Sequence, residues 1–216
     1  APPSELLLKI LRTLFQEKEA ALVSLLPIRP FTVEKAASVW KVSMAEAQKT
    51  LDVLADKALL LDIEMDGYTQ YVLPPPMAGF FEFSMMRIRE DVDQQALGEL
   101  FYQYLTVEED FIKALFTDGE TQLGRAFVDE TALTPENSLE VLDYERASEI
   151  IRTASHRGIG ICYCRHKMQH LGRACDAPLD ICMTFNTAAA SLVRHGYARE
   201  VDTAEGLDLL QQARDR

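Results

Sequence analysis

Four cysteines lie close together in the last third of the sequence, and they are the only thiols in it. Cys162, Cys164, Cys175 and Cys182 all fall within the segment GIGICYCRHKMQHLGRACDAPLDICMTF. Four thiolates can close a tetrahedral metal site or hold an iron–sulfur cluster. Their spacing is neither the C-x2-C pair of zinc ribbons nor the compact run of bacterial ferredoxins. The spacing alone therefore leaves the identity of the metal open.

The residues around the cysteines are basic, although the whole chain has a formal charge of −12. No acidic residue lies between positions 152 and 173, and three of the four histidines fall there. The basic and histidine residues of this stretch are Arg152, His156, Arg157, Arg165, His166, Lys167, His170 and Arg173. Positive charge keeps thiolates deprotonated and suits a negatively charged cluster. We expect Arg165 to donate to a thiolate or sulfide, with a surface salt bridge as the alternative.

The local elements must bring the four sulfur atoms together. If Ile159 to Tyr163 form a strand, Cys162 and Cys164 point to one face of it. A loop through Gly172, with a turn at residues 176–178, must then return Cys175 and Cys182 to that face. Four unligated core cysteines or a disulfide pair are the alternatives, because a free cysteine often behaves as a small apolar residue.

Two histidines offer a second, weaker metal site. His166 and His170 are four residues apart and can chelate a metal on one face of a helix. An exposed basic helix would hold them equally well. Elsewhere, no P-loop or Ser/His/Asp arrangement is present, and the fragment at Gly158 and Gly160 is too short for a dinucleotide loop.

Three segments of the chain resemble a known group of proteins. The segments VLDYERASEII, GIGICYCRHKMQHLGRACDAPLDICMTF and GYAREVDTAEGLDLL look like the central part of the bacterial and archaeal 4Fe-4S ferredoxin-like iron–sulfur proteins. In that group a winged-helix-like N-terminal region precedes a CxCR…C…P…C segment. The most specific matching positions are Cys162, Cys164, Arg165, Cys175, Pro178 and Cys182. Members of the group usually continue into a two-cluster ferredoxin module, which this sequence lacks.

The cysteine set and the resemblance together predict an iron–sulfur protein. The expected cofactor is a [4Fe-4S] cluster on the four cysteines, with Arg165 beside it, and the expected role is one-electron transfer with a protein partner. This describes an electron carrier or accessory subunit more than an enzyme. Two alternatives stay open: a redox-responsive winged-helix transcriptional regulator, and an adaptor subunit stabilised by a zinc ion on the same thiols.

The expected fold is mainly α with small β elements (α+β). Residues 1–73 predict a winged helix-turn-helix: helices begin after Ser4, near Glu17, after Thr32 and after Ser43, and an Asp66-Gly67 turn joins two strands. Between residues 41 and 66, three lysines stand against six acidic residues. Because phosphate neutralisation dominates DNA affinity, we expect nucleic acid not to be the partner.

Residues 74–120 predict a helical connector that could pair with a second copy of the chain. It begins with a triple proline, followed by an expected helix from Met77 to Ile88 and a long helix from Val92 to Phe116 that bends near Thr106. The large apolar side chains of the first helix are read as core or as a surface for a partner helix. These side chains are Phe80, Phe81, Phe83, Met85 and Met86.

Residues 121–216 predict a cysteine-rich cluster-binding domain. We expect strands near residues 125, 141 and 160 to form a small sheet beside the cysteines. Helices are expected over 144–154 and 185–194, and a last helix is expected to be capped by Thr203.

The overall composition is that of an ordinary soluble protein. The chain has 216 residues, of which 48% are hydrophobic and 26% are charged. The sequence has no run of about 18 consecutive apolar residues, so no membrane-spanning helix is expected. The N-terminus lacks the pattern of a signal peptide, and we expect a cytoplasmic location, where clustered cysteines favour metal over disulfides.

Overall fold

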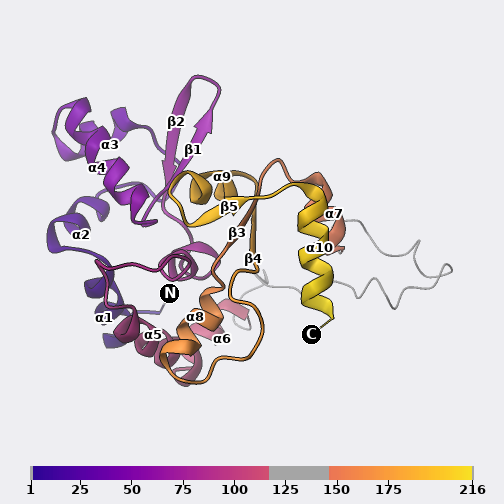
Figure 1. The fold of residues 1–216 in the computed structure, drawn as a ribbon. Helices are drawn as coiled ribbons and strands as arrows, with labels where there is room; N and C mark the ends of the chain where they lie inside the picture. The colour runs from indigo at the N-terminus through magenta and orange to yellow at the C-terminus, as the bar shows by residue number, and fades with distance from the viewer. Residues whose placement is uncertain (1, 117–145, 216) are drawn as a thin grey trace.

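The structure, a computed structural model, describes residues 2–116 and 146–215. The described chain is mainly helical and has two small antiparallel sheets, as the α+β expectation required (Figure 1). In chain order the elements are α1 (Glu5–Leu14), α2 (Glu17–Val23), α3 (Val33–Trp40), α4 (Met44–Asp56), β1 (Leu61–Met65), β2 (Tyr68–Val72), a π-helical turn (Pro76–Phe81), α5 (Gln94–Tyr102), a second π-helical turn (Gln103–Val107), α6 (Asp110–Phe116), α7 (Ala147–Thr153), β3 (Arg157–Gly160), α8 (Tyr163–His170), β4 (Cys182–Phe185), α9 (Asn186–Arg194), β5 (Ala198–Glu200) and α10 (Thr203–Arg214).

The first four helices begin where their capping residues predict. The Ser4 side chain accepts a hydrogen bond from the backbone N–H of Leu7 at the start of α1. Ser43 and Glu46 form the reciprocal capping box at the start of α4. Such caps satisfy backbone donors that have no partner within the helix. Trp40 joins the helices, because its indole N–H donates to the Leu22 carbonyl 2.8 Å away.

The first sheet is the hairpin that the Asp66-Gly67 turn predicts. β1 pairs with β2 from Leu61 opposite Val72 to Met65 opposite Tyr68, which leaves a two-residue loop. Gly67 has a φ of 89°, a value that glycine adopts without steric cost. Four helices followed by a hairpin is the element order that the sequence predicted for residues 1–73.

The segment after the triple proline is not the helix expected from Met77 to Ile88. A π-helical turn ends at Phe81, and turns follow it. Phe81, Phe83, Met85 and Met86 are all buried. On an α-helix Phe81 and Met85 would lie on one face and Phe83 and Met86 on the nearly opposite face, so a single buried face could not cover all four. The interpretation of these four side chains as core is therefore right.

An aromatic cluster surrounds Phe81. Its ring centroid lies 5.0 Å from that of Phe101, 5.7 Å from that of Phe111 and 6.0 Å from that of Tyr104. These partners come from α5, α6 and the π-helical turn between them, so the expected long helix is present but interrupted near Val107. The buried apolar cluster to which they belong extends from Ile10 to Tyr197.

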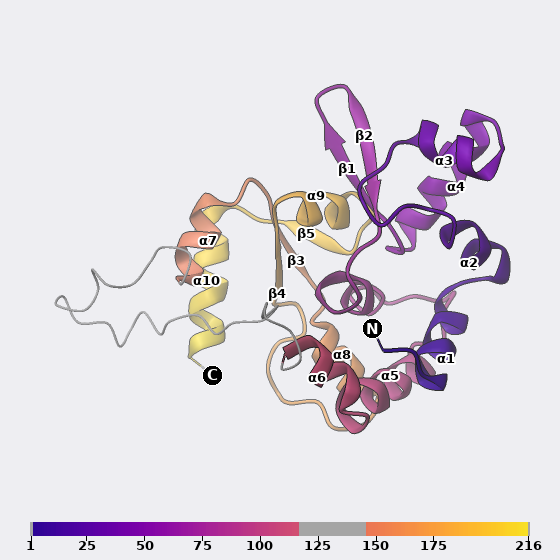
Figure 2. The ribbon, with the colours of Figure 1, turned by 180° about the vertical axis from the view of Figure 1, so that it is seen from behind.

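The second sheet has the order β4-β3-β5, with both pairings antiparallel. The expected strand near Ile159 is β3, but its partners differ from the expected ones. The strands expected near 125 and 141 lie outside the described residues, and both edges of β3 are taken by β4 and β5. Helix α9 packs against this sheet and against β1, while α10 lies beside α7 (Figures 1 and 2). The last helix is capped by Asp202 and not by Thr203.

A buried carboxylate connects the hairpin to α9. Asp62 is 8% exposed and accepts a hydrogen bond of 2.5 Å from the Ser191 hydroxyl. Its second oxygen lies 3.0 Å from Arg194 Nε and 3.2 Å from His195 Nε2. Although burial opposes its charge, these partners keep the pKa of Asp62 below its usual value.

The same contact makes part of the stability depend on pH. The hydrogen bond and charge of Asp62 raise the pKa of His195 above its usual value. The stabilisation from protonated His195 is therefore complete below about pH 6.5 and is lost as the pH rises through the folded-state pKa. We expect His195→Gln to lower the free energy of unfolding more at pH 5.5 than at pH 8.5, measured by urea denaturation. An equal loss at both values would contradict this.

Within the described residues, no helix has both the length and the apolar character needed to cross a membrane.

Candidate metal centre

The four cysteines lie on three consecutive elements. Cys162 is the residue that precedes α8, and Cys164 is in the first turn of that helix. Cys175 lies in the loop between α8 and β4, and Cys182 is the first residue of β4, opposite Gly160 of β3. All four are free thiols; Cys164 and Cys175 are exposed, and Cys162 and Cys182 are partly buried.

The strand expected from Ile159 to Tyr163 is shorter than the apolar run. β3 ends at Gly160, and α8 begins at Tyr163. Residues 165–170 have mostly long, unbranched side chains, which favour a helix. Cys162 and Cys164 therefore lie at the N-terminus of a helix and not on one face of a strand.

The loop between α8 and β4 folds back onto the start of α8. The backbone N–H of Cys162 donates to the Leu179 carbonyl 2.6 Å away. Arg165 Nη1 donates to the Pro178 carbonyl at 3.0 Å. These two bonds hold the loop that contains Cys175 over the first turn of α8.

Arg165 connects two of the thiols. Its Nε donates to Cys175 Sγ at 3.3 Å, and its guanidinium also lies within hydrogen-bonding reach of Cys162. Cys164 lies close enough to Cys162 to lower its pKa. The charge of Cys162 also acts on Cys182. Cys162 thus interacts electrostatically with Cys164 and Cys182, and Arg165 contacts Cys175.

The four thiols differ in how easily they lose a proton. The pKa of Cys162 is lowered to about 5 by the hydrogen bond from Cys164 and by Arg165. The pKa of Cys175 is lowered by the backbone N–H of Ala177 and by Arg165. The pKa of Cys164 is raised, chiefly by its interaction with Cys162. Burial raises that of Cys182 to about 12. A bound metal would stabilise all four as thiolates.

Glu82 is a neighbour of the cysteines that the sequence did not indicate. Burial, together with the charge of Cys162, raises the pKa of this carboxyl to about 7. Glu82 is separated from Cys162 by about 80 positions in the sequence, within a segment read as apolar core. Its placement follows from the turns after Phe81, which sequence periodicity did not predict.

The basic residues near the cysteines divide into two groups. Arg165 lies at the thiols, and Lys167 is buried with its charge acting on Cys164. The others face elsewhere: Arg152 contacts Glu149 and Ser148, Arg157 donates to the Ala154 carbonyl, and Arg173 lies over the ring of Tyr102. The predicted basic environment is therefore correct for Arg165 and Lys167 only.

The two histidines of α8 lie side by side, but His166 already contacts a backbone carbonyl group. The ring centroids of His166 and His170 are 5.0 Å apart. His166 is buried, and its Nδ1 lies 2.7 Å from the Met85 carbonyl oxygen. This contact secures α8 to the segment after Phe81.

The donor set suits a soft metal or an iron–sulfur cluster, since it consists of four thiols linked through Cys162 and Arg165. Among residues 2–116 and 146–215, however, no three His, Cys, Asp or Glu side chains form a group that could hold a metal ion. Binding an ion or cluster would therefore require the thiols to move closer together. Two of the candidate ligands, Cys164 and Cys175, are exposed and free of dense packing.

Gly160 of β3, which lies opposite Cys182, is closely packed against neighbouring residues. A methyl group at Gly160 would lie 2.6 Å from the Tyr197 carbonyl oxygen and 2.7 Å from Met86 Cε. Since the carbonyl belongs to the backbone, we expect Gly160→Ala to cost about 1–3 kcal/mol of stability, measured by urea denaturation. Gly158→Ala, whose nearest contact would be 3.1 Å from a side chain, should cost less. Equal stabilities of the two variants would contradict the argument.

Comparisons with known protein families, with curated proteins and with solved structures found no match to this chain.

Proposed function

We propose that the protein binds an iron–sulfur cluster, of the [4Fe-4S] type, and takes part in one-electron transfer with a protein partner. The observation that supports this is the hydrogen bond from Arg165, in the first turn of α8, to Cys175, which brings that thiol back to the helix end where Cys162 and Cys164 lie. The ligands would be Cys162, Cys164, Cys175 and Cys182. When bound, such a cluster supplies a site that accepts and releases single electrons.

The residues of the chain would tune this site. Arg165 already donates to one thiol and reaches a second, and donors of this kind alter the reduction potential of a cluster through its sulfur atoms. Lys167 adds positive charge beside Cys164. Both interactions favour a negatively charged group at the thiols.

The proposal includes a three-part organisation of the chain. Residues 1–73 would form a winged-helix-like docking module, residues 74–120 a helical connector, and residues 121–216 the cluster-binding domain. The order of α1 to α4 and the β1–β2 hairpin supports the first part. The proposal also includes a homodimer formed through the connector.

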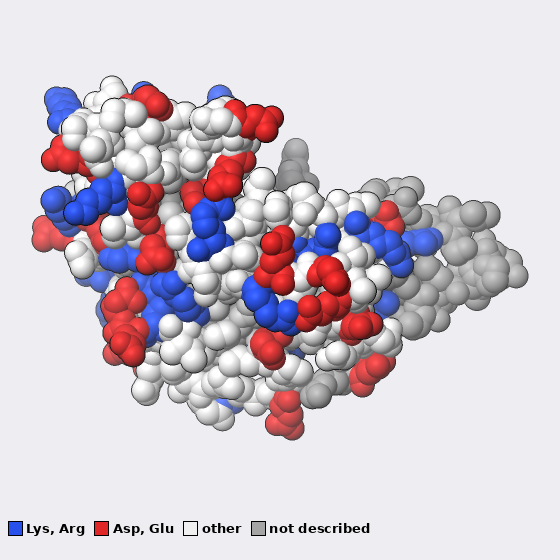
Figure 3. Space-filling model, turned by 45° about the horizontal axis from the view of Figure 1, so that its top comes forward, with Lys and Arg blue, Asp and Glu red and all other residues white. Residues whose placement is uncertain are grey.

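A role in DNA binding receives less support from the surface. Figure 3 shows Lys and Arg side chains interspersed with Asp and Glu on the face that includes the top of the molecule in Figure 1. Among the described residues of that face, no continuous basic area is present. Because phosphate contacts need such an area, a docking role for residues 1–73 is preferred over a transcriptional regulator.

Anaerobic reconstitution followed by chemical reduction tests the proposed electron transfer. We expect a broad visible absorbance that is bleached by dithionite and restored by reoxidation, together with an electron paramagnetic resonance signal in the reduced state. A protein that takes up iron and sulfide but shows no reversible reduction would be contrary to the proposal. Binding of zinc alone under these conditions would favour the adaptor function.

A further inference from the structure

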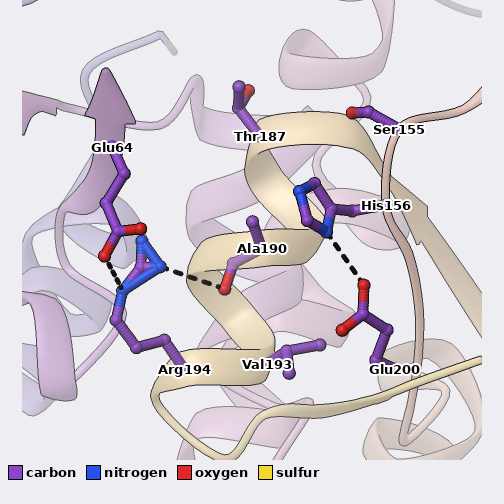
Figure 4. Close-up of a pocket in the computed structure, with 8 residues that line it drawn as sticks. All are labelled: Glu64, Ser155, His156, Thr187, Ala190, Val193, Arg194 and Glu200. Carbon is purple, nitrogen blue, oxygen red and sulfur yellow. Dashed lines mark hydrogen bonds and ion pairs between the residues drawn. The ribbon is translucent and has the colours of Figure 1, made fainter. Parts of the chain in front are cut away.

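A cavity lies along α9, and none of the four cysteines lines it. Its volume is about 480 Å³, and it is lined by residues from β1, α9, β5 and the segment before β3. Figure 4 shows α9 between Glu64 on one side and Glu200 on the other. The lining residues are Glu64, Ser155, His156, Thr187, Ala190, Val193, Arg194 and Glu200.

The centre of the cavity is apolar, whereas its two sides are acidic. Ala190 and Val193 of α9 lie between Glu64 and Glu200 (Figure 4). The side chains of the two glutamates are 70% and 57% exposed, respectively. A ligand entering from solvent can therefore reach a carboxylate at each end and apolar surface between them.

The guanidinium of Arg194, which lines the cavity, already contacts oxygen atoms of the protein. Arg194 Nε lies 3.0 Å from Asp62 and 3.4 Å from Glu64. Its Nη1 and Nη2 donate to the carbonyl oxygens of Ala190 and Asp62. With each of its three nitrogens in contact with a protein oxygen, the guanidinium joins β1 to α9 and does not attract an anionic ligand strongly.

The other side of the cavity presents acceptors. His156 Nδ1 lies 2.9 Å from Glu200 Oε1. If His156 donates its Nδ1 proton to this carboxylate, its other ring nitrogen is left as an acceptor. The lining residues also include two carboxylates against one guanidinium. These acceptors and carboxylates favour a cationic ligand that carries hydrogen-bond donors.

From this arrangement we infer that the cavity binds an aliphatic diamine or polyamine. One ammonium group contacts Glu64, a second contacts Glu200 and the nearby His156, and the methylene chain between them covers Ala190 and Val193. Glu64 contacts Arg194 through Oε1 and Glu200 contacts His156 through Oε1, so the Oε2 atom of each carboxylate is not used in these contacts. The inference is independent of the proposed cluster, because none of the cysteines lines this cavity.

Calorimetric titration at low ionic strength tests the inference, with α,ω-diaminoalkanes of three to six carbons and with the monoamine of matching length. Exposed ion pairs contribute up to about 1 kcal/mol, so we expect the best diamine to bind about fivefold more tightly than its monoamine. Added salt should weaken the binding. Equal affinities for diamine and monoamine, or no binding of either, would overturn the inference.

Single substitutions locate the two contacts. Glu64→Gln and Glu200→Gln should each weaken diamine binding about fivefold and bring it close to monoamine affinity. Glu99→Gln, which changes an exposed carboxylate on α5, is the matched control and should leave the affinity unchanged. Far-ultraviolet circular dichroism and the midpoint of urea unfolding check that each variant is folded. Unchanged binding by a folded Glu200→Gln variant would exclude this site.

Discussion

Replacing Cys162 with serine is expected to remove most of the bound iron. Cys162 immediately precedes α8, and its pKa is lowered to about 5 by the neighbouring Cys164 and Arg165. A serine hydroxyl is a poor ligand for soft metals, so the affinity for the cluster should fall at least tenfold. The measurement is iron per chain after anaerobic reconstitution, with visible absorbance as a second readout.

A matched control separates loss of a ligand from disturbance of α8. Met168→Leu changes a partly buried side chain of the same helix without removing a thiol, and it should keep the wild-type iron content. Full iron content in folded Cys162→Ser would show that Cys162 is not a ligand. The same substitution at Cys175 should also lower the iron content while residues 1–73 keep their fold.

Replacing Phe81 with alanine should have the largest effect on stability. Phe81 is 1% exposed and contacts the rings of Phe80, Phe101, Tyr104 and Phe111. Loss of a buried phenylalanine leaves a cavity and costs about 3–5 kcal/mol. Urea denaturation measures the loss as a lower midpoint.

The exposed Ile88 provides the control for this substitution. Its side chain is 72% exposed, and Ile88→Ala should change the free energy of unfolding by less than about 0.5 kcal/mol. Similar losses for Phe81→Ala and Ile88→Ala would mean that the aromatic cluster does not stabilise the fold as described.

Local signals in the sequence were sufficient for much of the N-terminal part. The Ser43 and Glu46 capping box and the Asp66-Gly67 turn act over a few residues, and both appear where expected. The cap of the last helix was misplaced by one position, because Asp202 and Thr203 are both good capping residues.

Elements that depend on distant partners were not predicted. β4 and β5 have four and three residues, too few for an alternating pattern, and they form strands because each pairs with β3. The turns after Phe81 likewise depend on burying side chains that a single helix face could not cover. Sequence periodicity contains no information about either requirement.

The candidate site shows the same division. The sequence identified the four cysteines and Arg165, and the contacts of Arg165 with Cys175 and Cys162 agree with the expected donor role. It did not indicate Glu82 or the N-terminus of α8, because both depend on where β3 ends and on which segment packs beside it. A statement that four thiols act together thus needs the fold as well as the spacing.

The most direct test of the central claim is a count of iron, acid-labile sulfide and zinc in protein purified without oxygen. The proposed [4Fe-4S] cluster predicts about four iron and four sulfide per chain, with little zinc. One zinc per chain without iron or sulfide, or no metal at all after reconstitution, would contradict it.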